Sequence, residues 1–194
     1  MSYLLTELRR ATGEIHARLH THPALRNLTS DSLSIHDYGF SLQRFYGFYL
    51  NHERLYAASG HELLPHFPAG TNIGWLMDDL ARLGIDVHTL PVLAVEETHF
   101  DRGQVLAYLY LREGSNLGGK VISASLQRSL GLRPGMDNRF YWGNGAAAGD
   151  RWKILRERLE ACEASTDIAE AGRYAGVLFE RLEAWLSLHE EAHA

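Results

Sequence analysis

The sequence predicts an all-α protein with a single domain over residues 1–194, and three observations support this. Apolar residues recur with helical spacing along most of the chain. Runs of alternating polar and apolar residues, which predict strands, are almost absent. The 194 residues, 45% of them hydrophobic, are enough to bury one substantial core. We therefore expect a bundle of helices.

The first expected helix covers residues 2–20, where an apolar stripe recurs every three or four positions. The stripe consists of Leu5, Leu8, Thr12, Ile15 and Leu19. The second expected helix begins at Ser34, an N-cap residue with Asp37 three positions later, and ends near residue 59. The other expected helices cover residues 72–83, 103–130, 150–163 and 167–189, the last of them opened by Asp167 with Glu170 three positions later.

Three glycines, Gly114, Gly118 and Gly119, lie inside the expected helix 103–130. Each costs about 1 kcal/mol relative to alanine, so their presence needs a compensating reason. One reason is a close crossing of two helices, and another is a large flat ligand that lies on the bare backbone. The stretch 114–120 also fits the phosphate-loop pattern G-x-x-x-x-G-K. However, Val121 stands where that motif needs Ser or Thr, and no parallel strands are predicted, so a nucleotide site is disfavoured.

A flat ligand would need an anchor on its other face, and His16 is the candidate. At 100° per residue it lies roughly 80° from the centre of the apolar stripe, at the border between core and solvent. Arg9 lies almost on the same line, two turns earlier and about 10 Å away along the axis. An imidazole and a cation so placed could bind a metal and an acidic substituent of one ligand. An ordinary polar residue at a helix border is the alternative interpretation of His16.

Two stretches together resemble heme oxygenases, over nearly the whole chain in length and helix order. LRRATGEIH, residues 8–16, is similar to their N-terminal helix, in which the histidine after an Ala-Thr pair is the proximal iron ligand. YLREGSNLGGKVI, residues 110–122, is similar to their kinked, glycine-rich distal helix in its bacterial form. The resemblance implies a heme oxygenase-like bundle that holds heme between these helices, with His16 as the axial ligand of the iron.

The resemblance also implies an activity, the oxidative cleavage of heme to biliverdin, iron and CO. Heme b would be both substrate and prosthetic group, with O₂ and an external reductant. Gly114, Gly118 and Gly119 would crowd the oxygen toward one edge of the ring, and Ser115 and Asn116 would organise the water that supplies protons. The residues expected to bind the heme propionates are Arg9, Lys120, Lys153 and Arg156. An ordinary lysine on an exposed helix face is the alternative interpretation of Lys120.

The sequence departs from the family pattern at two positions. Animal enzymes have an aspartate after the distal glycine, where Ser115 stands here. Many members have a glutamate four residues after the proximal histidine, where this chain has His20. The first departure leaves the residue that delivers protons open, and the second removes an anion that would orient the histidine ring.

The expected partners follow from the same chemistry and from the charge. A ferredoxin or a flavin reductase would donate electrons, while use of the products stays open between iron release and biliverdin supply to a phytochrome. The net charge of −5 gives no general basic field for nucleic acid. No apolar run approaches the roughly 20 residues of a membrane span. A single cysteine, Cys162, suits a reducing compartment, and we expect a cytoplasmic protein.

Two alternatives remain at this stage. A sensor or carrier with the same fold would bind heme without cleaving it, and its sequence would look the same. The pairs Glu96-x-x-His99 and Glu190-x-x-His193 have the spacing of di-iron bundles, but they lie after Pro91 and at the chain end. Their positions therefore disfavour a di-iron site.

Overall fold

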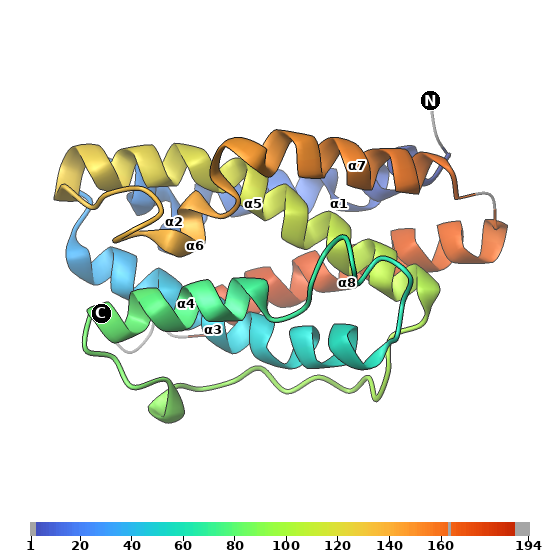
Figure 1. The fold of residues 1–194 in the computed structure, drawn as a ribbon, viewed down its shortest axis with the longest axis horizontal. Helices are drawn as coiled ribbons and strands as arrows, with labels where there is room; N and C mark the ends of the chain where they lie inside the picture. Colours follow the sequence, from blue (N-terminus) through green and yellow to red (C-terminus); the bar gives the residue numbers. More distant parts are fainter. Residues whose placement is uncertain (1–2, 163, 189–194) are drawn as a thin grey trace.

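Long helices make up most of the protein in the computed structural model, which describes residues 3–162 and 164–188 (Figure 1). They are α1 (Tyr3–Thr21), α3 (Ile35–Ala58), α4 (Thr71–Arg82), α5 (Arg102–Leu130), α7 (Ala148–Glu160) and α8 (Ser165–Ser187). Short elements connect them: α2 (Pro23–Arg26), η1 (Asn27–Thr29), η2 (Val87–Thr89), α6 (Arg139–Trp142) and η3 (Gly145–Ala147). The described residues contain no strand, so the all-α prediction is confirmed.

The first four expected helices are confirmed to within one residue at each end, because their signals are local. The stripe of α1 is buried as predicted, at Leu5, Leu8, Thr12, Ile15 and Leu19. At the start of α3, Ser34 and Asp37 form a capping box: the Asp37 amide donates to Ser34 Oγ at 3.1 Å, and the Ser34 amide donates to Asp37 Oδ2 at 2.9 Å. Gly131, in the left-handed region with φ of 70°, ends α5.

The predicted start of the last helix was wrong. Helix α8 begins at Ser165, so Asp167 lies in its first turn and does not cap it. The Asp167 carboxylate instead forms an ion pair with Arg102 at the start of α5, with Nε and Oδ2 3.2 Å apart. Helix α7 likewise begins two residues before its predicted start. The predicted ends at residues 163 and 189 lie outside the described residues. The short elements were missed because segments of three or four residues are too short to show a helical repeat of apolar residues.

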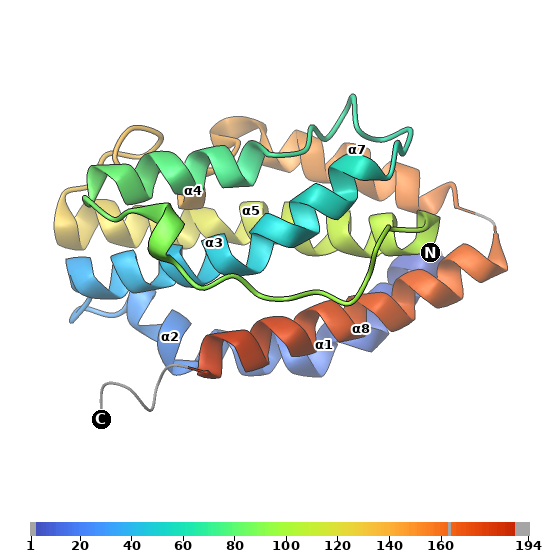
Figure 2. The ribbon, with the colours of Figure 1, turned by 90° about the horizontal axis from the view of Figure 1, so that it is seen from below.

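Helix α8 packs against both α1 and α5, and α3 packs against α4. Figure 2 shows α1 and α8 running side by side along one edge of the bundle. Helix α5 crosses the middle of the molecule, and Figure 1 shows its axis bending between its green N-terminal part and its yellow C-terminal part. Residues 114–120 lie inside this continuous helix, so they do not form the loop that a phosphate-binding motif needs.

Residues 91–97, between η2 and α5, form an extended segment that crosses α3 (Figure 2). The Leu93 amide donates to the Gly47 carbonyl at 3.0 Å, which ties the segment to α3. Glu96 and His99 are exposed and lie outside any helix, so they lack the shared helical face that a di-iron motif needs. Glu190 and His193 lie outside the described residues. Within the part of the chain that the structure describes, no helix is long and apolar enough to cross a membrane.

Candidate functional site

A cavity of about 500 Å³ lies between α1 and α5, within the usual 300–1,000 Å³ range of ligand pockets. Apolar and aromatic side chains form most of its wall, and a few polar groups point into it. Its lining residues on α1 and the segment after it are His16, Leu19, His20, Leu25 and Thr29. Those on α5 are Tyr110, Leu111, Gly114, Ser115, Asn116, Leu117, Gly118, Gly119, Val121 and Ile122. Phe45, Phe140, Tyr141, Trp152, Phe179 and Leu182 complete it.

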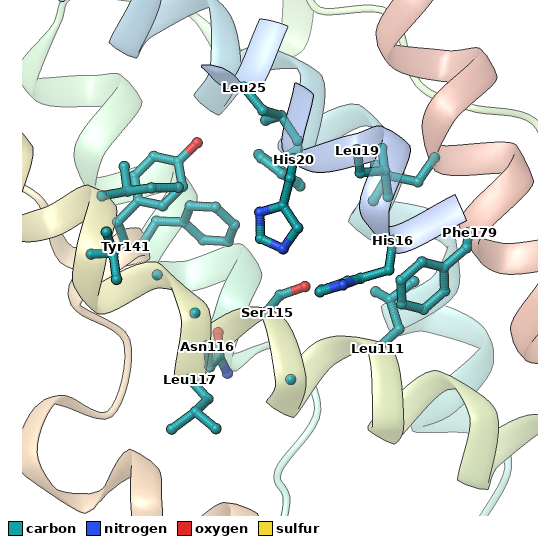
Figure 3. Close-up of a pocket in the computed structure, with 18 of the residues that line it drawn as sticks. His16, Leu19, His20, Leu25, Leu111, Ser115, Asn116, Leu117, Tyr141 and Phe179 are labelled. Atoms are coloured by element: carbon teal, nitrogen blue, oxygen red, sulfur yellow. The ribbon is translucent and has the colours of Figure 1, made fainter. Parts of the chain in front are cut away.

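His16 enters the cavity from α1, on the side that faces α5 (Figure 3). The Phe179 ring of α8 packs beside it, with centroids 6.1 Å apart. His20, one turn later, also points into the cavity, and its ring lies 4.5 Å from that of His16 at an angle of 89°. Burial lowers the pKa of His16, and the electrostatic interaction with the neighbouring His20 side chain lowers it further. The His16 imidazole is therefore neutral at neutral pH, with a lone pair available for a metal.

The three glycines of α5 have different neighbours. A Cβ on Gly118 would meet no atom within 4 Å, so no packing contact requires a glycine there. A Cβ on Gly119 would lie 2.6 Å from the Tyr141 carbonyl oxygen, so the close approach of α6 requires this glycine. A Cβ on Gly114 would make an ordinary contact of 3.8 Å with Trp152. Close packing thus explains Gly119, while Gly118 keeps the cavity side of the helix bare.

Ser115 and Asn116 follow Gly114 at the cavity. Ser115 is exposed to it, across from His16 (Figure 3). Asn116 is buried and pairs with Asn72 of α4: each side-chain amide donates to the oxygen of the other at 3.3 Å. The pair fixes the orientation of the Asn116 carboxamide. Sequence reasoning missed Asn72, because a lone asparagine near a helix start has no distinguishing pattern.

A buried ion network lies directly before Gly114 in α5. Arg112 is 1% exposed and contacts Glu53 of α3 at 3.1 Å and Glu113 at 3.0 Å. Arg151 of α7 contacts Glu113 from the other side at 3.2 Å. Arg112 also donates to the Phe67 and Pro68 carbonyls, at 3.2 and 3.3 Å. The network joins the glycine-containing part of α5 to α3 and α7. Charged residues are normally exposed, so the network could not be predicted from the sequence.

The four cations expected at the heme propionates do not line this cavity within the described residues. Arg9, Lys153 and Arg156 are exposed, and Lys120 is half-buried. Arg156 lies 3.7 Å from Glu160 on the surface of α7. Their role toward an acidic group at the cavity edge stays a prediction.

Aromatic residues form much of the cavity wall. Phe45, Tyr141 and Phe179 line it, and so do Tyr110 and Trp152, whose rings are 5.7 Å apart. Trp185 is not part of the wall, because it packs against the Arg44 guanidinium at 4.0 Å and donates to the Arg44 carbonyl at 2.8 Å. Helical spacing does not distinguish these two kinds of aromatic residue, since all of them are buried or partly buried.

The fold is that of solved heme oxygenases. The structure of heme oxygenase from Leptospira interrogans superposes with a TM-score of 0.78 at 21% identity, over 96% of this chain and 99% of that chain. The NO- and CO-bound heme oxygenase from Neisseria meningitidis superposes with a TM-score of 0.71 at 22% identity, over 96% of this chain and 90% of the other. No protein-family model matches the sequence, and no curated protein matches it significantly.

Proposed function

We propose that this chain, which has the heme oxygenase fold, is a heme oxygenase that cleaves heme to biliverdin, iron and CO. The observation that carries the proposal is the cavity lined by His16 on the α1 side and by the glycine-containing stretch of α5 on the other side, where a Cβ at Gly118 would meet no atom within 4 Å. The solved structures from Leptospira interrogans and Neisseria meningitidis, which share this fold, are both heme oxygenases, and the second was solved with NO and CO bound.

The residues present fit a heme. The cavity is bounded by a helix on each side, its wall is mainly apolar and aromatic, and the imidazoles of His16 and His20 enter it from the α1 side. Open space at Gly118 would let a flat ring lie against the α5 backbone. The described residues contain no group of three or more histidines, cysteines or carboxylates that could hold a metal ion, which disfavours a different metal centre as the main occupant.

Each residue would have a distinct task. His16 would hold heme through its iron, and the bound heme would supply the activation of O₂. Gly114 and Gly118 would keep side chains away from the ring on the α5 side. Ser115 and Asn116 offer a hydroxyl and a carboxamide that can order water and pass protons to that side.

The same proposal extends to the surroundings of the site. Arg9, Lys120, Lys153 and Arg156 would bind the propionates where heme leaves the cavity. An electron-donor protein, a ferredoxin or a flavin reductase, would dock near this edge, and exposed cations there favour an acidic partner. Either iron release or biliverdin supply to a phytochrome would use the products, in the cytoplasm.

A titration with hemin followed by reduction in air tests the proposal. The wild-type protein is expected to give a Soret band typical of histidine ligation, which then disappears as biliverdin absorption develops. His16→Ala is expected to lose the histidine-type spectrum and the turnover. His88→Ala, at an exposed histidine of η2 far along the chain from the cavity residues, is the matched control and should behave as wild type.

Two outcomes would contradict the proposal. Heme that binds through His16 but survives reduction in air would make the protein a heme sensor or carrier with the same fold. A protein that does not bind hemin at all would have no heme function, and Gly118 would then need another explanation.

A further inference from the structure

His16 and His20 are four residues apart on one face of α1, and their rings are in contact, with centroids 4.5 Å apart. Both side chains are exposed to the cavity, and Figure 3 shows both rings on the side of α1 that faces α5. Two histidines with this spacing on one helical face supply two of the three or four protein ligands with which proteins usually hold zinc. Imidazole nitrogen is also a preferred ligand of copper, nickel and iron.

The surroundings leave both imidazoles available. Among the described residues, neither His16 nor His20 forms a hydrogen bond or an ion pair that a metal would have to break. No third histidine, cysteine or carboxylate stands close enough to complete a larger cluster there. Water would therefore occupy the remaining coordination positions, and such a two-ligand site exchanges its ion readily.

We propose that His16 and His20 form a chelate for a divalent first-row transition-metal ion when no large ligand fills the cavity. The chelate depends only on the geometry of α1. Its use rests on the proposed function: iron released from the opened ring is set free beside His16. His20 then supplies a second ligand that holds the ion at the cavity wall before it leaves.

Zinc binding to the protein without heme tests the chelate, by isothermal titration calorimetry in a buffer that does not bind metals. The sequence has a second pair of histidines four residues apart, His189 and His193, which lie outside the described residues. The titration therefore uses the full chain with His189→Ala and His193→Ala as the background. We expect one Zn²⁺ site, weakened about tenfold or more by His16→Ala or by His20→Ala. His88→Ala in the same background should leave the affinity unchanged.

The proposal would be overturned by a zinc affinity that does not change in either the His16 or the His20 variant, provided circular dichroism shows the variants folded. Repeating the zinc titration with hemin present tests the chelate separately from the proposed function. Saturating hemin should block zinc binding, because heme and zinc would compete for His16. A zinc site that depends on both histidines but persists with saturating hemin would support the chelate and contradict heme ligation by His16.

Discussion

At the residue scale, the orientation of the site side chains depends on residues outside the cavity. Asn116 lines the cavity, but Asn72 of α4 holds its carboxamide through two mutual hydrogen bonds of 3.3 Å. Both residues are buried, so an amide that loses its partner cannot turn to bulk solvent. Asn72 is therefore a positioning residue for the α5 side of the cavity.

Replacing Asn72 by leucine should lower the free energy of unfolding by about 1–3 kcal/mol, because the Asn116 amide loses its buried partner. The variant should bind hemin nearly as well as wild type, since Asn72 does not line the cavity within the described residues. Its rate of heme cleavage should fall, because Asn116 is no longer held toward the reacting side. Urea denaturation, hemin titration and single-turnover rates measure the three effects.

Asn72→Asp is the matched control for this prediction. An aspartate keeps an oxygen that accepts from the Asn116 amide, so the variant should recover much of the rate lost in Asn72→Leu. Equal rates in the wild-type and leucine proteins would show that the amide pair has no part in the reaction.

His52 of α3 makes stability depend on pH. Burial lowers its pKa from the ordinary 6.5 to about 4, and its Nε2 is buried without a hydrogen-bond partner. Between these two pH values the unfolded chain binds a proton that the folded protein does not, so stability falls as the pH falls. This one residue should cost about 2 kcal/mol between pH 7 and pH 5.

The measurement is urea denaturation at pH 7 and pH 5 for wild type and His52→Leu. The variant should lose less stability over this interval, by about the 2 kcal/mol assigned to His52. His88→Ala, at an exposed position, should keep the wild-type dependence. A leucine variant with the full wild-type slope would place the proton uptake elsewhere.

At the scale of elements, α5 combines two different demands on its backbone. Its inner face approaches α6 so closely that Gly119 has no room for a side chain. Its cavity face carries Gly118, which has room but no packing neighbour. The buried network of Arg112, Glu53 and Glu113 holds the part of α5 that precedes these glycines in the sequence. Helix α5 is thus fixed to the bundle on one side and left open on the other.

Alanine substitutions distinguish the packing role of Gly119 from the cavity role of Gly118. Gly118→Ala should stabilise the heme-free protein by up to about 1 kcal/mol through helix propensity, and should weaken hemin binding because the added methyl group enters the cavity. Gly119→Ala should destabilise the protein by about 1–3 kcal/mol, since its Cβ would lie 2.6 Å from the Tyr141 carbonyl oxygen. Urea denaturation and hemin titration measure both variants. Equal destabilisation by the two substitutions would contradict this distinction.

At the scale of the whole molecule, α1 and α5 each pack against α8, and the cavity lies between them. A ligand in the cavity would connect the two helices directly. A ligand at 100 times its Kd stabilises the folded state by about 2.7 kcal/mol, and the local effect is largest where new contacts form. Bound heme would therefore fill the space between α1 and α5 and contact both helices.

Hydrogen exchange with and without hemin tests this role. Amide exchange should slow in α1 around His16 and in the glycine-containing part of α5, while the extended segment 91–97 should change little. His16→Ala should remove the protection of α1. Uniform protection of the whole chain, or none in α1, would show that the ligand does not connect these two helices.

The sequence by itself determined the long helices and the two sides of the cavity. The buried stripe of α1, the capping box at Ser34 and Asp37, and the glycines of α5 all depend on residues within a few positions of each other. Local spacing and local hydrogen bonds decide such features, so the sequence alone predicts them. His16 at the border of the α1 stripe was predictable for the same reason.

Only the tertiary structure decided which groups meet. Asn72 and Asn116 are 44 positions apart, and Glu53 and Arg112 are 59 positions apart. Their types give no sign of pairing, because the same residues are common on exposed helix faces. The structure also assigned Gly119 to packing and left Gly118 to the cavity, although the two are adjacent. The distinction arises because neighbouring residues on a helix point about 100° apart, and only the surrounding helices determine what lies in each direction.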